Sequence, residues 1–119
     1  MKTVNTQLQA SSVSMSASQA STLTAKLDQI SLVDVTAVIA GSSPNGSIKL
    51  QKNNNPPEVA AVWVDLDDTE VYNGNNSRTI TTGATFNWCL DQFGARELRA
   101  YITRSSGTIT ADIRVHGKE

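Results

Sequence analysis

The sequence predicts an all-β fold, an antiparallel β-sandwich of about eight or nine strands in two sheets, with jelly-roll or Greek-key winding. Three observations predict this fold. Apolar and polar residues alternate with a period of two along much of the chain. Clusters of Gly, Pro, Asn and Ser separate these stretches at short intervals. Ser, Thr and Asn are abundant, and their side chains compete with the backbone hydrogen bonds of a helix.

The N-terminal part is expected to hold an arm followed by two strands. Residues 1–10 are polar and lack periodicity, so we expect a flexible arm ahead of a single domain at residues 11–119. Residues 12–17 and 22–27 alternate between polar and apolar side chains, which predicts two strands. A helix over residues 18–27 is the alternative, and the β-branched threonines there disfavour it.

The most apolar run of the sequence, residues 31–40, is expected to be a central strand. Apolar residues occupy both of its faces, as in a strand with neighbours on either side. A dense turn signal at residues 41–46 follows, and residues 48–51 then alternate again. The sequence therefore predicts that these two strands pair as a hairpin.

A surface loop and a further strand are expected next. Pro56 and Pro57 cannot donate backbone hydrogen bonds, so residues 53–57 should form a loop. Residues 59–66 then resume a strand, and residues 70–72 form a short one. The alternation in the first of these predicts three inward-facing side chains, which are Val62, Val64 and Leu66.

The C-terminal third shows the clearest alternation. In residues 85–90 the shared apolar face includes Phe86 and Trp88, and we expect Trp88 in the core. Residues 97–103 and 108–116 also alternate, and a Ser-Ser-Gly turn separates them. These two segments are expected to form a C-terminal hairpin. Its inward residues are Leu98, Ala100, Ile102, Ile109, Ala111, Ile113 and Val115.

Composition and charge exclude several classes of function. The chain has 119 residues, 10 basic and 11 acidic side chains and a net charge of -1, which gives no electrostatic reason to expect nucleic acid or an anionic membrane as partner. No apolar run approaches the roughly 20 residues of a membrane span. A single cysteine, Cys89, excludes an internal disulfide and a Cys-rich zinc site, and its apolar neighbours predict a buried structural thiol.

The residues that could carry chemistry do not form a recognisable catalytic or metal-binding pattern. The acidic turn with Asp65, Asp67, Asp68 and Glu70 could bind Ca²⁺, but its spacing is not that of an EF-hand, and a solvated turn is favoured. His116 is the only histidine. We therefore expect no catalytic residues, no cofactor and no metal, with an enzyme using these acids or His116 as the less favoured alternative.

Aromatic and arginine side chains are the candidate contact residues. Trp63 alternates away from its apolar neighbours, so it lies either in the core or in a contact patch. Tyr72 and Tyr101 fall on less apolar faces and are expected to be exposed. Three arginines are grouped in the sequence, and they form either an interface set, since arginine is enriched at interfaces, or a solvated set across neighbouring strands. The candidate interface or ligand residues are Trp63, Tyr72, Tyr101, Arg96, Arg99 and Arg104.

Several short motifs follow one another along residues 11–118. They are SSVSMSA at 11–17, an apolar strand ending in glycine at 31–41, GSIKLQ at 46–51, three asparagines at 53–55, WVDL at 63–66, ELR at 97–99 and SGTIT at 106–110. In this order they resemble small virion structural proteins of tailed bacteriophages. The chain has Pro56-Pro57 where the loop of that family often has Asp-Gly.

The resemblance implies a particle protein without catalytic activity, such as a head decoration or cement protein. Its implied partners are copies of itself, in a homo-oligomer such as a trimer, and the major capsid protein or another virion protein. Its implied location is the virion, after assembly in the host cytoplasm. The alternative is a glycan- or receptor-binding module of a tail fibre or similar surface protein, with Trp63, Tyr72 and Tyr101 as a stacking platform.

Overall fold

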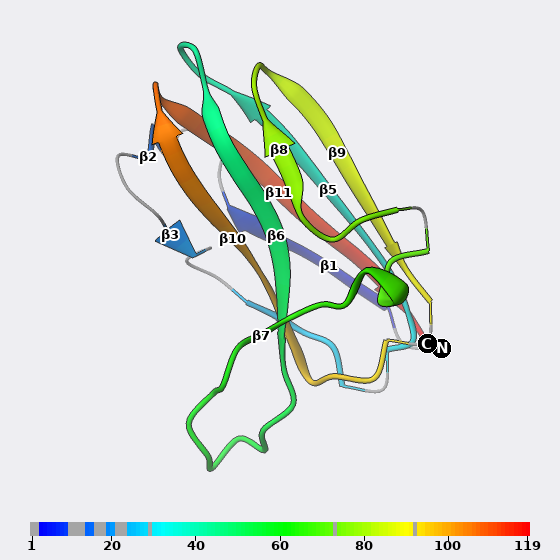
Figure 1. Cartoon of the computed structure of the whole chain (residues 1–119). Helices are drawn as coiled ribbons and strands as arrows, with labels where there is room; N and C mark the ends of the chain where they lie inside the picture. Colours follow the sequence, from blue (N-terminus) through cyan, green and yellow to red (C-terminus); the bar gives the residue numbers. More distant parts are fainter. Residues whose placement is uncertain are drawn as a thin grey trace.

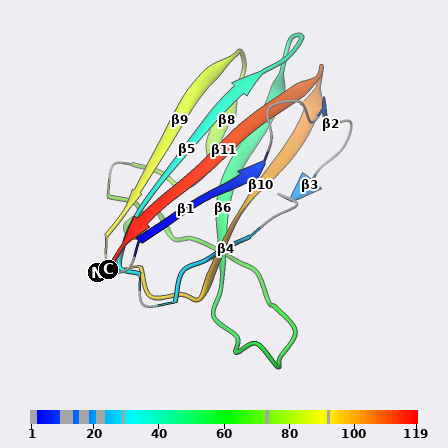
Figure 2. The same ribbon diagram turned by 180° about the vertical axis from the view of Figure 1, so that it is seen from behind.

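The computed structural model describes residues 3–9, 14–15, 19–20, 24–28, 30–72, 74–91 and 93–119. Within these residues, eleven strands form two antiparallel sheets that pack face to face (Figure 1). Sheet A, which Figure 2 shows from its own side, contains β1 (Thr3–Gln9), β2 (Ser14–Met15), β5 (Leu32–Ala40), β9 (Ala84–Leu90) and β11 (Ile109–Lys118). Sheet B contains β3 (Gln19–Ala20), β4 (Ala25–Lys26), β6 (Asn45–Asn53), β7 (Val64–Asp65), β8 (Arg78–Ile80) and β10 (Glu97–Ser106). No helix in the described part of the chain is long and apolar enough to cross a membrane.

The winding of the chain is that of a jelly roll. Sheet A has the order β1-β11-β5-β9, and β2 extends the pairing of β1 along β11. Sheet B has the order β3-β10-β6-β7, with β4 also beside β10 and β8 also beside β6. Short strands that lie end to end along the same edge of one neighbour can be counted as one strand, namely β1 with β2, β3 with β4, and β7 with β8. The sandwich then has eight strands. Successive strands alternate between the two sheets, except that β6 is followed by β7 and β8 in the same sheet. This confirms the predicted all-β sandwich and its jelly-roll winding.

Both predicted hairpins are wrong, because each pair of strands is split between the two sheets. β5 pairs with β11 and β9, whereas β6 pairs with β10, β7 and β8. In the same way β10 belongs to sheet B and β11 to sheet A. The period of two determines which face of a strand is buried, and it carries no information about which strand lies beside it.

The turns that take the chain from one sheet to the other pack closely against each other. The amide of Thr108 donates to the carbonyl of Ser42 at 3.0 Å, and the amide of Ser42 donates to the Thr108 hydroxyl at 2.8 Å. Gly41 and Gly107 have φ values of 129° and 72°. A Cβ at Gly41 would collide with the Thr108 carbonyl, so the residue that ends the apolar run has to be glycine.

The N-terminal segment expected as a flexible arm is an edge strand over Thr3–Gln9. β1 pairs with β11 from Thr3↔Lys118 to Gln9↔Ile113, and the side chain of Leu8 is fully buried. Pairing with β11 supplies the order that the polar sequence does not indicate. Of the strand predicted at residues 12–17, only Ser14–Met15 lies within the described residues. Six of the ten residues of the helix alternative at 18–27 are described, and Gln19–Ala20 and Ala25–Lys26 among them are strands, the second within the strand predicted at 22–27.

The core between the sheets is formed by the residues that the alternation assigned to it. All seven inward residues predicted for β10 and β11 are buried, and Trp88 is fully buried, as expected. Phe86 is partly buried and packs against this core. The other fully buried large side chains are Leu8, Leu27, Ile30, Ile48, Leu50 and Ile80. Apolar burial on this scale supplies most of the stability of the fold.

The prediction for residues 59–72 is largely wrong. Only Val64–Asp65 forms a strand, and Val62 and Val64 are exposed although Leu66 is buried. The predicted strand at residues 70–72 is replaced by a 3₁₀ turn, η1 (Asp68–Glu70), and by a single bridge from Val71 to Leu90. Residues 54–63 form a loop before β7, and residues 66–77, here called the insertion, leave the sheet between β7 and β8, which both pair with β6.

Candidate functional site

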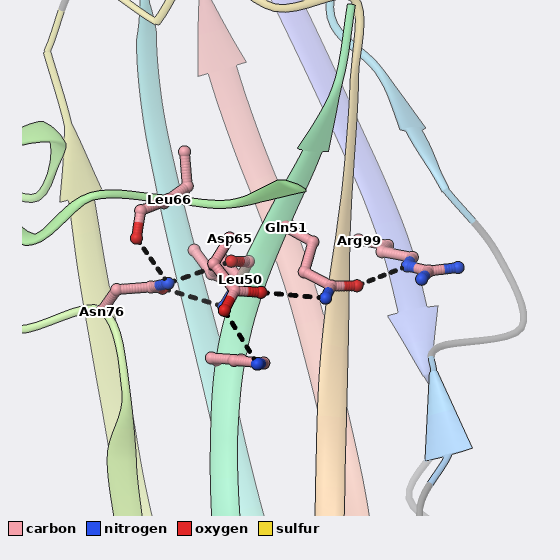
Figure 3. A network of polar contacts seen from close by, with 7 residues as sticks. Leu50, Gln51, Asp65, Leu66, Asn76 and Arg99 are labelled. Atoms are coloured by element: carbon pink, nitrogen blue, oxygen red, sulfur yellow. Dashed lines mark hydrogen bonds and ion pairs between the residues drawn. The ribbon is translucent and has the colours of Figure 1, made fainter. Parts of the chain in front are cut away.

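A buried asparagine, Asn76, fills the gap that this insertion leaves beside β6. Its Oδ1 accepts from the Leu50 amide at 2.9 Å, and its Nδ2 donates to the carbonyls of Leu50 and Leu66 at 3.1 and 2.9 Å (Figure 3). The carbonyl of Asn76 accepts from the indole nitrogen of Trp88 at 2.8 Å. One side chain thus replaces the missing strand residue and ties the insertion to the core, where unsatisfied backbone groups would be costly.

A second buried asparagine, Asn53, holds the loop that follows β6. Its Oδ1 accepts from the amides of Asn55 and Val62 at 3.1 and 3.2 Å, and its Nδ2 donates to Glu97 at 2.8 Å. Within the loop, Asn55 Nδ2 donates to the Ala60 carbonyl at 2.8 Å. Arg96 donates to the Asn55 carbonyl at 2.6 Å. Residues 54–63, here called the projecting loop, therefore have a fixed shape although they extend beyond both sheets (Figures 1 and 2).

The projecting loop displays apolar side chains to solvent. Val59 and Val62 are 50% and 60% exposed, and Val64, directly after the loop, is 53% exposed. Pro56 and Pro57 are exposed as well, and Glu58 is the only charged residue between Asn53 and Asp65. Exposed apolar side chains that lie together are typical of an interaction surface.

A row of polar and aromatic side chains crosses the outer face of sheet B beside this loop. The Arg99 guanidinium lies 4.4 Å from the centre of the Trp63 ring and donates to Gln51 at 2.8 Å. Gln51 donates to Asp65 at 3.0 Å (Figure 3). Lys49 pairs with the same carboxylate at 2.9 Å. The ammonium of Lys49 also lies 5.9 Å from the centre of the Tyr101 ring.

The electrostatics of this row follow from its contacts. The hydrogen bond from Gln51 and the contact with Lys49 lower the pKa of Asp65 below its ordinary value. Partial burial lowers the pKa of the Arg99 guanidinium, which stays charged at neutral pH. The row presents one carboxylate and two cations between two aromatic rings, an arrangement that can bind polar partners by hydrogen bonding and stacking.

The outer face of sheet A carries an open apolar depression, here called the sheet A pocket, of about 340 Å³. Leu32, 40% exposed, supplies apolar side-chain surface, and the side chain of Tyr72, 82% exposed, stands at its border. Val33 and Leu90 also line the pocket, although they are buried and belong to the core. Its polar lining residues are Asp34, Cys89, Asp91, His116 and Lys118. His116 Nδ1 lies 2.6 Å from Asn5 Oδ1 of β1. This pocket was not predicted, because its lining comes from four segments that are far apart in the sequence.

Cys89 lines this pocket, so its predicted place in the core is wrong. Trp88 and Leu90 face inward, and the alternation therefore turns Cys89 toward the outer face. Its thiol lies 3.5 Å from Asp34 Oδ1 and 3.2 Å from Asn87 Oδ1. Partial burial, and then the contact with Asp34, raise the pKa of the Cys89 thiol, which makes it a weak nucleophile at neutral pH.

The structure brings three of the six candidate contact residues together. Trp63, Arg99 and Tyr101 belong to the row on sheet B, and all three are partly buried. Tyr72 lies at the sheet A pocket, on the opposite side of the sandwich, so the three aromatic residues do not form one platform. The remaining arginines serve the fold, since Arg96 pairs with Asp28 at 3.1 Å and Arg104 donates to the Gly107 carbonyl at 2.5 Å.

The acidic turn is used for local structure. Asp67 caps η1 by accepting from Thr69, and Glu70 accepts from the Asp67 amide and pairs with Lys52. Asp68 accepts from the Asn76 amide at 2.9 Å. In the described residues, no group of three or more His, Cys, Asp or Glu side chains is placed to hold a metal ion.

Comparisons with known proteins find a shared fold at very low sequence identity. No family model matches the chain, and no curated protein matches it. The crystal structure of the SPBc2 prophage-derived protein YomS matches with a TM-score of 0.59 at 14% identity, covering 98% of this chain and 96% of that chain. The crystal structure of PirA matches with a TM-score of 0.53 at 8% identity, covering 98% and 93%. These likenesses show the fold, and function has to be argued from the surfaces.

The residues that matter most at these surfaces were not visible in the sequence. Asn53 and Asn76 each lie in an asparagine-rich stretch that predicts only a loop or a turn. Both are buried, and each satisfies backbone groups from another part of the chain. The sequence signal for these buried asparagines is weak: each stretch has more asparagines than a turn needs.

Proposed function

We propose that the protein is a structural component of a tailed-phage virion, of the head decoration or cement type, and not an enzyme. It would act by contacts with copies of itself and with the major capsid protein or another virion protein, after assembly in the host cytoplasm. The observation that carries this proposal is the projecting loop, which is held rigid and displays apolar side chains. The likeness to a prophage-derived protein and the sequence resemblance to virion proteins support a phage origin.

The energetics of such a contact are favourable. Burying a valine side chain fully contributes roughly 1.5–3 kcal/mol, and Val59, Val62 and Val64 are each about half exposed. The hydrogen bonds of Asn53 fix the loop beforehand, so little conformational entropy is lost on binding. In a particle with many identical sites, modest contacts of this kind add up to a stable assembly.

The distribution of acidic residues supports a role without catalysis. Asp67, Asp68 and Glu70 accept hydrogen bonds that hold η1 and Asn76 in place. Asp65 is engaged by Lys49 and Gln51. Acids that hold the local structure in this way are poorly placed to exchange protons with a substrate.

The test uses virions of the phage that encodes the chain. Val59→Asp combined with Val62→Asp should leave the melting temperature nearly unchanged and lower the amount of the protein in purified virions at least tenfold, measured by quantitative mass spectrometry. Thr81→Asp combined with Thr82→Asp, in the exposed turn before β9, is the matched control and should be incorporated normally. Virions that lack the wild-type chain would overturn the proposal.

One observation favours a second candidate function, glycan binding on the outer face of sheet B. Trp63 and Tyr101 are the aromatic members of a row of hydrogen-bonding groups, a combination suited to the apolar faces and hydroxyls of a sugar. Trp63→Ala and Tyr101→Ala should each abolish binding on a glycan array, whereas Tyr72→Ala, on the other side of the sandwich, should not. An array without any bound glycan would eliminate this candidate.

A further inference from the structure

The sheet A pocket is a second surface that exposes apolar residues, and the proposed function leaves it without a role. Its volume of about 340 Å³ has room for roughly ten water molecules. Its exposed apolar side chains are Leu32, 40% exposed, and Tyr72, 82% exposed, whereas Val33 and Leu90 are only 3% exposed. Water on such a surface is released favourably when an apolar group of matching size enters.

The projecting loop has the shape and chemistry to enter such a pocket. Its exposed side chains, Val59 and Val62, are apolar, and the rest of the loop is proline, alanine and asparagine apart from Trp63 and one acid. That acid, Glu58, would meet the cation Lys118 among the residues that line the pocket. Two acids, Asp34 and Asp91, also line the pocket. The Asp34 carboxylate already accepts a hydrogen bond from the side-chain amide of Asn87 at 2.7 Å, and Asp91 is exposed to solvent.

A loop cannot reach the pocket of its own chain. The loop leaves from the end of β6 in sheet B (Figures 1 and 2). The pocket opens on the outer face of sheet A, and the core lies between the two sheets. Each molecule therefore presents a protrusion and a recess that only another molecule can bring together.

We propose that the projecting loop of one copy binds in the sheet A pocket of a second copy. In the head-to-tail form of this contact each copy passes its loop to the next, so a dimer keeps one unoccupied loop and one unoccupied pocket, and the assembly grows until a ring closes or continues as an open filament. The inference rests on the proposed function only in treating the projecting loop as a contact surface. It names the partner of that loop as a copy of the same chain.

Mixing two variants tests the head-to-tail contact directly. Val59→Asp with Val62→Asp disables the loop, and Leu32→Asp with Tyr72→Ala disables the pocket. In analytical ultracentrifugation, the wild type should form species larger than a dimer and each variant alone should be monomeric. An equimolar mixture of the two should form a heterodimer and nothing larger, because one intact loop and one intact pocket remain.

The control lies on the same face as the pocket. Val38→Asp makes a comparable change on the outer face of β5, four residues or about 13 Å beyond Asp34, and should assemble like the wild type. Circular dichroism and thermal melting of every variant show that the fold is retained. If the pocket variant does not fold, Tyr72→Ala alone replaces it, since that side chain is almost fully exposed.

Disulfide trapping tests which residues meet. Cys89 is the only cysteine and lines the pocket, so Val62→Cys should form an intermolecular disulfide with Cys89 under mild oxidation. The reaction is run above pH 9 because the Cys89 thiol ionises poorly. Thr82→Cys, at the far end of the molecule, should give at least tenfold less of the corresponding product, and peptide mass spectrometry identifies the bridge.

The outcomes separate this inference from the proposed function. A monomeric wild type, or a mixture that forms no heterodimer, would overturn the head-to-tail contact even if virions contain the chain. Heterodimers in the mixture would support it even if virions lack the chain. A Cys89 disulfide with position 62 and not with position 82 would support the assigned surfaces, and equal yields from both would overturn them.

Discussion

The two C-terminal strands and the segment from Asn53 to Ser77 are held in place by different forces. β10 and β11 bury every second side chain in the core, and their stability comes from apolar area. Residues 53–77 bury few large side chains, and the hydrogen bonds of two asparagines keep their shape. The first region provides the scaffold, and the second carries the apolar loop that we propose as the contact surface.

The difference determines how each region should respond to substitution. Apolar burial is spread over many side chains, so a substitution that removes volume from the core costs part of the stability and more as the cavity grows, whereas an unpaired buried charge can cost as much as the whole of it. A segment that is held by the hydrogen bonds of one buried side chain depends on that residue, and loss of the side chain releases the whole segment. Substitutions in the two regions should therefore differ in what unfolds as well as in how much stability is lost.

The largest effect is expected from Ile113→Asp in β11. Ile113 is fully buried, and an unpaired buried carboxylate costs several kcal/mol, comparable to a total stability of about 5–15 kcal/mol. The variant should lose its cooperative melting transition and its near-ultraviolet circular dichroism. Arg114→Gln, at the adjacent exposed position, should melt within a few degrees of the wild type. A native transition in Ile113→Asp would contradict the inward facing of this strand.

The next largest effect is expected from Asn76→Asp. The carboxylate cannot donate to the carbonyls of Leu50 and Leu66, and leaving such buried groups unsatisfied costs roughly 1–3 kcal/mol each. Burial beside carbonyls should raise the pKa of this Asp in the folded state above its unfolded value of about 3.9. The loss relative to wild type should therefore be smallest below pH 4 and grow as the pH rises.

Urea denaturation at pH 3 and pH 7 measures this dependence. Asn75→Asp, at the exposed neighbouring position, is the matched control and should show little loss at either pH. A loss from Asn76→Asp that is equal at the two pH values would contradict the donor role assigned to the amide.

The contrast between apolar burial and hydrogen bonds from single side chains also explains which features of the structure can be predicted from the sequence. The period of two identifies the buried face, so Leu98 and Trp88 were placed correctly. It does not identify the neighbouring strand, and both hairpins were therefore assigned wrongly. Asn53 and Asn76 act on backbone groups brought near by the fold, and no local pattern marks them. The sheet A pocket, with Cys89 in it, depends on which strands become neighbours and was invisible for the same reason.

A local effect is expected from Asn53→Ala. The amides of Asn55 and Val62 lose their acceptor, and Glu97 loses a donor, while the core strands stay packed. We expect a loss of about 1–3 kcal/mol in global stability and at least tenfold faster amide hydrogen exchange in the projecting loop. Asn54→Ala, at the exposed next position, should leave the exchange unchanged. Slow amide exchange in the loop of the Asn53 variant would show that the hydrogen bonds of Asn53 are not needed to hold the loop in place.

The smallest effect is expected from Asp65→Asn on the outer face of sheet B. The Asp65 side chain is 52% exposed, and an exposed pair such as Asp65 with Lys49 contributes at most about 1 kcal/mol. Because Gln51 and Lys49 lower the pKa of Asp65 in the folded state, its contribution is present above the unfolded pKa of about 3.9. That contribution disappears as the pH falls through the lower folded pKa. The difference in unfolding free energy between wild type and variant should thus shrink as the pH falls below about 3.9, and it should also shrink in 1 M salt, where the Debye length is about 3 Å. Asp and Asn have nearly the same shape, so a difference that does not shrink at low pH would contradict a contribution from the charge of Asp65.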